Sequence, residues 1–258
     1  MRKNPVKESL RAGNPAFGTM VFEFFTPGIA QIVRAAGAEF ILLDMEHSGV
    51  GMETLKACIA TCRGIGLTPL VRIPTLQYHF IARCLDIGAM GIMVPMVESA
   101  AQAREIVSAT RYPPAGRRGS AFGFAHDDYA GGPVPAKMAI ANERTLVMVL
   151  VETATGLAAV DEIAAVDGVD VIWLGHADLT TFMGIPGQFD NPTYLNAVDR
   201  IVQAARRNKK PAGTMAANEG WARDYLAKGF SVIAYGADHH LLQRALSEGL
   251  SRIRAMVK

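Results

Sequence analysis

Cysteine, surplus charge and long apolar runs are all scarce in this sequence of 258 residues. The three cysteines, Cys58, Cys62 and Cys84, cannot pair into a disulfide framework, and the first two are not spaced as a CxxC metal clip. They indicate reduced, buried thiols and a cytoplasmic location. The formal net charge of +2 gives no overall reason to bind nucleic acid or an anionic membrane.

No apolar stretch reaches the roughly 18 residues that a membrane span needs, and the first residues lack the apolar segment of a signal peptide. Half of the residues are hydrophobic, so a chain of this length can bury a core without disulfides. The composition therefore indicates a soluble globular protein and excludes a disordered or fibrous one.

Short apolar runs alternate with longer segments of helical period. Eight runs have the β-branched and aromatic content of buried parallel strands: Ala16–Phe22, Phe40–Met45, Thr68–Ile73, Gly91–Pro95, Thr145–Val151, Val169–Leu174, Pro211–Met215 and Phe230–Ala234. Helices are predicted at Pro27–Ala36, Met52–Ile65, Gln77–Ile87, Ser99–Thr110, Thr155–Val166, Pro192–Asn208, Glu219–Lys228 and His239–Ala255.

This alternation predicts an α/β protein with a parallel sheet, and eight units predict a (β/α)8 TIM barrel forming a single domain over residues 1–258. The alternative, an open doubly wound sheet, lacks a GxGxxG motif after the first strand. Residues 111–144 interrupt the pattern and are rich in glycine, proline and arginine. They predict a long loop insertion with a functional or inter-subunit role.

Polar side chains gather where the predicted strands end, which is where (β/α)8 barrels place their active sites. They are Asp44, Glu46, His47, Arg72, Glu98, Glu152, His176, Asp178, Asp238, His239 and His240. Each also has a structural interpretation. Arg72 could pair with Asp44 or Glu46, His47 could be an ordinary loop histidine, and Asp178 could cap a helix.

Glu152 follows six apolar residues, and an unpaired carboxylate in that position needs a cation. Glu152 and Asp178 leave neighbouring strands, about 4.8 Å apart, at the same end of the barrel. Two carboxylates with water and substrate oxygens are typical of a divalent metal ion, Mg²⁺ or Mn²⁺, with Co²⁺ as a further choice. Its open positions can hold an oxo acid and stabilise an enolate.

Other residues at these strand ends complete such a site. Arg72 offers a forked donor to the substrate anion, the turn Gly175–Ala177 offers backbone N–H groups to a carboxylate, and His47 can move a proton. No lysine ends these strands, which disfavours a Schiff-base mechanism.

Six segments, in order, carry a family resemblance: AGAEFILLDMEHS, TPLVRIP, CLDIGAMGIMVPMVESA, RYPPAGRRG, VETATGLAAVDEIAAVDGVDVIWLGHADLT and GTMAA. Together they resemble the HpcH/HpaI family of class II pyruvate aldolases, of the 4-hydroxy-2-oxoheptanedioate aldolase type. The resemblance implies a metal-dependent TIM-barrel lyase that reversibly cleaves a 4-hydroxy-2-oxo acid to pyruvate, or a related 2-oxo acid, and an aldehyde. It also implies a cytoplasmic homo-oligomer, a hexamer built from dimers that exchange their last helix, and a role in aromatic catabolism.

The resemblance also assigns roles to residues of this chain. Glu152 and Asp178 correspond to the metal ligands, Arg72 to the arginine on the pyruvyl oxygens, and His47 to the acid/base histidine. Asp44 lies at the same strand end as His47, and Asp86 corresponds to an aspartate that approaches the histidine from a neighbouring subunit. The predicted substrate-binding set is Arg72, Gly175, His176, Ala177, Asp178 and Met215.

The chain departs from the family pattern at three places. Leu150 stands where many members have glutamine, and His176 stands where many have proline. His176 is interpreted as a second acid/base, a substrate contact or a surface variant. The stretch around His126, Asp127 and Asp128 is interpreted as the aldehyde side of the pocket or, preferably, as a solvated turn.

Three rival functions stay open at this point. One is an acyl-CoA carbon–carbon lyase of the citrate-lyase type, with Arg117 and Arg118 on the CoA phosphates. Another is an enolate-using decarboxylase or cyclase resembling macrophomate synthase. The third is a non-catalytic barrel that binds an oxo acid and regulates a partner.

Overall fold

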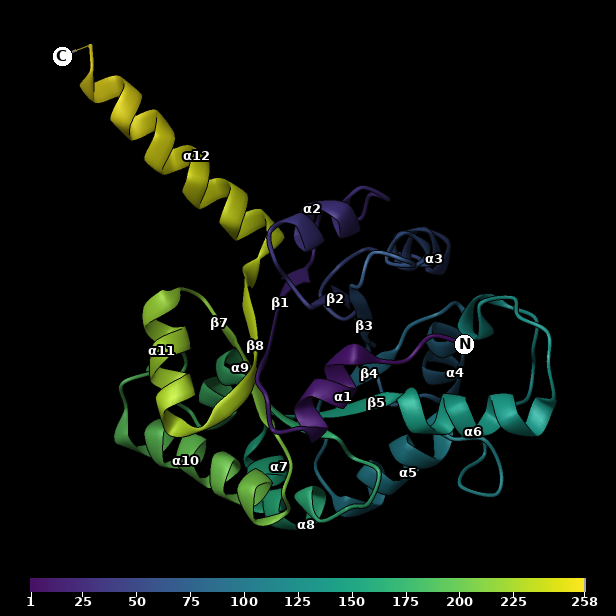
Figure 1. Ribbon diagram of the computed structural model, residues 1–258. Coiled ribbons are helices and arrows are strands. Elements are labelled where there is room, and N and C mark those ends of the chain that lie inside the picture. Colours follow the sequence, from purple (N-terminus) through teal and green to yellow (C-terminus); the bar gives the residue numbers. More distant parts are fainter. Residues whose placement is uncertain (258) are drawn as a thin grey trace.

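The chain closes into an all-parallel barrel in which each strand pairs with the next and β8 returns to β1 (Figure 1). The computed structural model describes residues 1–257. The strands are β1 Ala16–Val21, β2 Phe40–Asp44, β3 Thr68–Arg72, β4 Gly91–Val94, β5 Leu146–Val151, β6 Val171–Leu174, β7 Ala212–Ala216 and β8 Phe230–Ala237. The predicted (β/α)8 barrel and all eight predicted strands are confirmed.

Alternation along the strands divides the apolar side chains between two cores. Met20, Leu42, Leu70, Met148 and Trp173 point inward and belong to a cluster that fills the barrel. Their neighbours in sequence point outward into a larger core between the strands and the surrounding helices. The interior is therefore packed with side chains and is not a channel.

Helices follow most strands, as expected from a βα repeat. They are α1 Pro5–Arg11, α2 Ile29–Ala35, α3 Met52–Thr61, α4 Tyr78–Asp86, α5 Ala100–Thr110, α6 Val134–Arg144, α7 Ala154–Ala158, α8 Val160–Ala164, α9 His176–Phe182, α10 Pro192–Arg207, α11 Glu219–Lys228 and α12 Asp238–Ala255, with a 3-10 turn η1 at Ala125–Asp127. The helix predicted at 155–166 is two short helices that meet at Ala159.

The segment 111–144 is irregular only as far as Pro133, apart from η1, because α6 occupies its last eleven residues. The sequence prediction of a loop missed this helix. Its apolar residues show only a weak helical periodicity, although Pro133 and Pro135 mark its start. Residues 111–133 include η1 and lead into α6, after which the chain returns to the barrel at β5.

Helix α1 closes the N-terminal end of the barrel. Val6 and Leu10 join the inner core, and the Asn4 side chain donates hydrogen bonds of 2.9 Å to the carbonyl oxygens of Met90 and Arg144. With this end covered and the interior filled, the open face of the barrel is the end at which the strands finish.

Helix α12 extends away from the body of the barrel (Figure 1). Asp238 is its only buried residue among those described, and a stripe of apolar side chains at helical spacing is exposed, namely Leu242, Leu246, Leu250 and Ile253. This helix leaves its apolar face without a partner in the single chain. None of the helices in residues 1–257 is both long and apolar enough to cross a bilayer.

Candidate active site

A cavity of about 140 Å³ opens where the strands end. It is lined by Met20, Phe22, His47, Arg72, Leu150, Glu152, Trp173, Leu174, Gly175, His176, Ala177, Asp178 and Met215. The structure thus brings together most of the predicted site residues, from positions far apart in sequence. Asp44 and Asp86 are not among the residues that line it.

Arg72 is held at the cavity by two carboxylates. Its Nε pairs with Asp44, and its NH1 lies 3.1 Å from Oε2 of Glu46. Asp44 is fully buried, and its Oδ2 also accepts a 2.8 Å hydrogen bond from the His47 backbone N–H. Arg72 therefore forms the predicted ion pairs with Asp44 and Glu46, and it also lines the cavity. Asp44 orients both the arginine and the loop that carries His47.

Glu152 is 2% exposed, and its Oε1 accepts a 2.8 Å hydrogen bond from the backbone N–H of Met96. Its Oε2 lies so close to Gly175 that a Cβ at this position would overlap it. Burial, followed by repulsion from Glu46 and Asp178, raises the pKa of Glu152 to about 8. Gly175 is thus required by the close approach of a carboxylate that lacks a compensating cation.

Negative charge exceeds positive charge around this cavity. Burial also raises the pKa of Glu46, although Arg72 opposes the shift. Oε2 of Glu46 is buried without a hydrogen bond, apart from its ion-pair contact with Arg72. Across the described chain, no three His, Cys, Asp or Glu side chains are arranged to hold a metal ion by themselves. The oxygen-only donors of Glu152 and Asp178 fit a hard divalent cation that keeps open positions.

The N-terminus of α9 forms one wall of the cavity. Gly175 occupies the N-cap position without a side-chain hydrogen bond, and Asp178 lies within the first turn. The alternative in which Asp178 caps the helix is therefore wrong. The first N–H groups of a helix have no partner within it, so the backbone of His176, Ala177 and Asp178 presents donors beside Glu152.

His176 lies against an aromatic cluster. Its ring centroid is 5.6 Å from that of Phe189 and 5.3 Å from that of Trp221, both in edge-to-face geometry. Burial lowers the pKa of His176 to about 4, so the imidazole is neutral at physiological pH. The surface-variant interpretation does not agree with this partly buried position, and a pKa this low makes His176 a weak general base.

His47 lies at the rim, with a side chain that is 55% exposed and an Nε2 that is 3.8 Å from Oε2 of Glu46. Asp86 ends α4, where its carboxylate accepts a 2.6 Å hydrogen bond from Arg118. The role of Asp86 beside the histidine of another subunit stays a prediction, because within one chain it does not reach the cavity.

Several functional positions were not recognised in the sequence. Met20, Phe22 and Trp173 give the cavity an apolar floor together with Leu150 and Met215. Alternation along the strand offers a signal for some of them, because Leu150 precedes Glu152 by two residues and faces the same side. No sequence pattern marks the Met96 N–H that holds Glu152, since it depends on a left-handed backbone with φ of 55°.

The segment around η1 does not form a solvated turn, so that preferred interpretation is wrong for two of its three residues. His126 is 1% exposed and Asp127 is fully buried. The Tyr112 hydroxyl lies 3.3 Å from Nε2 of His126, and Lys137 donates a 2.7 Å hydrogen bond to Asp127. Nε2 of His126 and Oδ2 of Asp127 therefore have protein partners, whereas Nδ1 of His126 and Oδ1 of Asp127 are buried without a hydrogen bond among the described residues.

At the end of β8, Asp238 has a structural role. Its carboxylate accepts hydrogen bonds of 2.7 to 3.0 Å from the backbone N–H groups of Phe22, Glu23 and Phe24. His239 lies beside it, with its Nδ1 3.3 Å from Oδ1 of Asp238. This acid therefore fixes the loop after β1 and leaves the cavity to Glu152 and Asp178.

Comparison with known proteins gives a consistent relationship. The profile described as HpcH/HpaI aldolase/citrate lyase matches residues 19–245. A hydroxypyruvate/pyruvate aldolase of Delftia acidovorans is 38% identical over 98% of this chain and 93% of its own length. A 4-hydroxy-2-oxovalerate aldolase of Novosphingobium aromaticivorans is 38% identical over 98% of this chain and 96% of its own.

The solved structures give the same result. The crystal structure of an HpcH/HpaI aldolase from Desulfitobacterium hafniense superposes with a TM-score of 0.91 at 30% identity, covering 96% of both chains. Because the matches extend from the first strands into the last helix, they include every element that contributes to the cavity. The chain belongs to the HpcH/HpaI aldolase/citrate lyase family.

Proposed function

We propose that this protein is a divalent-metal-dependent aldolase that reversibly cleaves a 4-hydroxy-2-oxo acid to pyruvate, or a related 2-oxo acid, and an aldehyde. The observation that carries the proposal is the buried, uncompensated carboxylate of Glu152 beside Asp178, at a cavity that also holds Arg72 and His47. Membership of the family and the names of its 38% identical relatives support this class of reaction.

In this proposal Glu152 and Asp178 hold the cation, and Mg²⁺ or Mn²⁺ suits the carboxylate donors better than softer metals do. When bound, the ion supplies Lewis-acid stabilisation of negative charge on the oxo-acid oxygens. Arg72 donates to the same C2 oxygen, so its guanidinium stabilises the enolate charge that develops there. The α9 N–H groups of Ala177 and Asp178 receive the substrate carboxylate.

His47 is the proton carrier of the proposed reaction. During cleavage a base takes the proton from the C4 hydroxyl, the C3–C4 bond breaks, and its electron pair passes into the pyruvate enolate. The exposed imidazole of His47 lies at the rim, where the C4 end of a substrate faces the aldehyde side of the cavity. The proton then returns to C3, which completes the methyl group of pyruvate.

The cavity suits a small donor acid. Its volume is about 140 Å³, and Met20, Leu150 and Trp173 in its lining carry no charged group to pair with a further carboxylate. Relatives are named for pyruvate, hydroxypyruvate and longer sugar-derived oxo acids. We propose pyruvate or hydroxypyruvate as the donor, with the aldehyde bound on the side of His47.

Glu152→Gln tests the proposal. We expect it to weaken metal binding, measured by calorimetry, and to abolish exchange of the pyruvate methyl protons with D₂O, measured by NMR. Glu162→Gln, on the exposed face of α8, is the matched control. Methyl exchange at the wild-type rate by chelator-treated Glu152→Gln would contradict the metal assignment.

Product analysis separates the rival functions from this one. With pyruvate and a panel of aldehydes, an aldolase forms 4-hydroxy-2-oxo acids without coenzyme A. An acyl-CoA lyase would require the thioester, a decarboxylase or cyclase would give other carbon skeletons, and a regulatory binding barrel would give no solvent exchange into bound pyruvate.

We also propose that the protein is a homo-oligomer in which α12 packs on a second copy. An apolar groove of about 520 Å³ lies between β1, α2 and the start of α12, lined in part by Phe17, Phe24, Ile32 and Leu242. The exposed apolar stripe of α12 has the complementary chemistry. Deleting residues 241–258 should reduce the mass in light scattering to that of one chain, and an unchanged mass would contradict the exchange. A hexamer built from such dimers fits the same proposal.

A further inference from the structure

A second cavity lies at the opposite end of the barrel from the candidate active site. It has a volume of about 290 Å³ and is lined by Lys7, Leu10, Arg11, Leu146, Val169, Asp170, Asn208, Lys209, Lys210 and Pro211. These residues come from α1 and from the points where β5, β6 and β7 begin. This N-terminal cavity is separated from Glu152 by the length of β5, roughly 20 Å for a strand of six residues.

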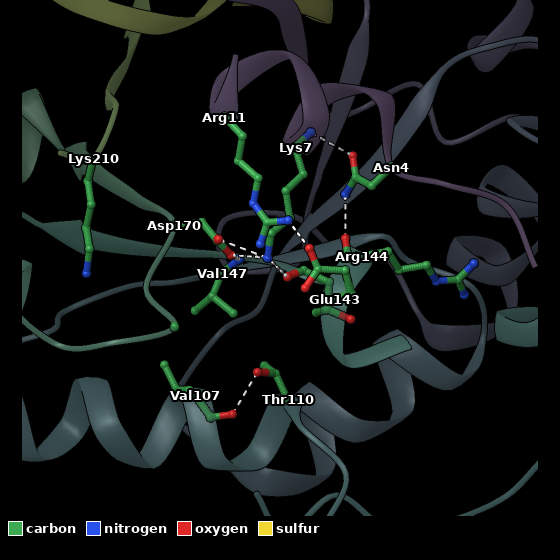
Figure 2. A network of polar contacts seen from close by, with 12 residues as sticks. Asn4, Lys7, Arg11, Val107, Thr110, Glu143, Arg144, Val147, Asp170 and Lys210 are labelled. Atoms are coloured by element: carbon green, nitrogen blue, oxygen red, sulfur yellow. Dashed lines mark hydrogen bonds and ion pairs between the residues drawn. The ribbon is translucent and has the colours of Figure 1, made fainter. Parts of the chain in front are cut away.

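The wall of the N-terminal cavity is strongly cationic. Asp170 is its only acid, and that carboxylate already has two cationic neighbours. Nζ of Lys7 lies 2.9 Å from it and also donates a 2.7 Å hydrogen bond to the Thr145 carbonyl oxygen, while Arg111 lies 3.8 Å from Asp170 on the other side. Figure 2 shows Lys7 reaching from α1 to Asp170, with Lys210 to the left of that carboxylate.

Among the described residues, the two lysines at the rim form no close ion pair, although Asp167 and Asp170 are near enough to Lys210 to raise its pKa against the effect of burial. Arg11 pairs with Glu143, so that charge is balanced (Figure 2). Within residues 1–257, neither Lys209 nor Lys210 forms an ion pair, and Nζ of Lys210 donates only to the Val166 carbonyl oxygen at 2.5 Å. Burial lowers the pKa values of Lys7, Arg111 and Lys210, although the negative charge of Asp170 opposes the shift in all three.

Lys209, at the rim of the N-terminal cavity, has an unusual backbone conformation. Lys209 follows the last turn of α10 with φ of 55°, a left-handed conformation in which glycine is usual after a helix. Directly after α11, the chain has Gly229 in the left-handed region with φ of 107°, whereas after α10 the left-handed residue is Lys209, one position beyond Asn208. A lysine at such a position places a cation at the rim in spite of the conformational strain.

The floor of the N-terminal cavity is aliphatic. Leu10, Leu146 and Val169 are at most 8% exposed, and Pro211 completes the surface. A bare inorganic ion uses only the cationic rim of such a cavity. An anion with a short carbon skeleton uses both the rim and the floor, because its methylene groups cover apolar surface while its charges meet the lysines.

We propose that the N-terminal cavity binds a small organic polycarboxylate at the rim formed by Lys209 and Lys210. The site is independent of the proposed aldolase reaction, since it lies at the other end of the barrel and shares no residue with the candidate active site. Lysine ammonium groups act here as point charges for carboxylates, and Asp170 limits the number of negative groups that the cavity accepts.

Calorimetry with propane-1,2,3-tricarboxylate tests the proposal. This probe has no 2-oxo or hydroxyl group, so it lacks the chelating pair that the candidate active site recognises, and the protein is used free of added metal. We expect saturable binding to the full chain with a Kd below about 10 mM. The double variant Lys209→Gln with Lys210→Gln should weaken it at least about tenfold.

Two matched variants locate the site. Lys56→Gln with Arg104→Gln removes the same charge from exposed positions on α3 and α5 and should leave binding unchanged. Lys209→Gly relieves the left-handed backbone, so it keeps the fold while removing one cation, and it should weaken binding. Arg72→Lys, at the candidate active site, should have no effect on the probe.

Three results would overturn the proposal. They are the absence of saturable binding to the wild type, equal weakening by the Lys56 and Arg104 control, and loss of binding in Arg72→Lys with retention in the Lys209 and Lys210 variant. The same titrations are repeated with sulfate at matched ionic strength. If sulfate binds the wild type as tightly as the tricarboxylate does, and is weakened equally by the Lys209 and Lys210 double variant, the proposal that the ligand is organic is contradicted.

Discussion

The two ends of this barrel carry opposite charge. Where the strands finish, Asp44, Glu46, Glu152 and Asp178 gather around the single guanidinium of Arg72. Where the strands begin, cations outnumber acids in and around the N-terminal cavity, whose lining contains Lys7, Lys209 and Lys210 but only one acid, Asp170. The same eight parallel strands thus support an acidic end and a basic end.

The ends differ in how the buried charge is treated. Lys7 and Asp170 are paired under α1, and the unpaired lysines lie at the rim. At the other end the unpaired group is the buried one, Glu152, whose pKa is raised to about 8. A buried pair stabilises a fold only if both partners are present, whereas a buried carboxylate without a partner is a site for a cation. Four predictions test this contrast, from the largest expected effect to the smallest.

Arg72→Lys should reduce aldol cleavage by about 10²- to 10³-fold, because it keeps the charge but loses the fork that donates to the enolate oxygen and to Asp44. Steady-state kinetics with pyruvate release as the readout checks this. Arg117→Lys, which alters an exposed ion pair with Glu105, should keep the wild-type rate. A wild-type rate in Arg72→Lys would limit Arg72 to a structural role.

Lys7→Met should lower the free energy of unfolding by about 2–3 kcal/mol, because it leaves the partly buried Asp170 with the Val147 N–H and the more distant Arg111 as its partners, and leaves the Thr145 carbonyl without its donor. Urea denaturation measures the change, and Lys3→Met, whose side chain is 84% exposed, serves as the control. The contrast between the ends predicts that the kcat of the folded Lys7→Met enzyme is unchanged. A fall in kcat without loss of stability would refute it.

Gly175→Ala should weaken metal binding by about tenfold, because the added methyl group meets Oε2 of Glu152 and displaces that carboxylate. Calorimetric titration with Mn²⁺ provides the measurement. Gly131→Ala is the control, since a Cβ at Gly131 meets no atom within 4 Å. Equal metal affinity in both variants would show that the contact between Gly175 and Glu152 has no bearing on the ion.

The last prediction concerns pH at the basic end. Burial, and then repulsion from Arg118, lowers the pKa of His126. The unfolded chain therefore binds this proton first as pH falls below about 6.5, and stability decreases by up to about 1.4 kcal/mol per pH unit until the folded pKa is reached. Denaturation of the wild type and His126→Gln across this range should show a shallower slope in the variant, in which the slope that remains includes the contribution of His176, whose pKa is also lowered by burial.

His79→Gln, at an exposed position on α4, is the control and should keep the slope of the wild type. If His126→Gln and the wild type change equally with pH, the buried histidine does not contribute to the acid sensitivity of the fold.

The barrel and much of the site were predictable because they depend on local patterns. Buried parallel strands are short and apolar, so β5 and β6 are visible in the sequence, and barrel closure brings the groups that follow them, Glu152 and Asp178, to one end. Arg72 was recognisable as a charge inside an apolar run. These inferences need only the period of the strands and the rule that a barrel has one active end.

The remainder depends on contacts between distant segments. The burial of His126 needs Tyr112 and the burial of Asp127 needs Lys137, and nothing in the local sequence announces either contact. Helix α1 has seven residues, too few for an amphipathic period, although Asn4 and Pro5 form a recognisable helix start. The cationic end stayed unrecognised because Lys7 and Asp170 are 163 positions apart.

The closure of the N-terminal end of the barrel by Val6 and Leu10 determines the path by which small molecules enter and leave the active site. Because α1 covers one end of the barrel and side chains fill its interior, a molecule can reach and leave Glu152 only through the end at which the strands finish. The two products of a cleavage reaction at this site therefore share one exit, and the product bound nearer the opening leaves before the product bound deeper. The single opening of the barrel thus determines the order in which the products are released.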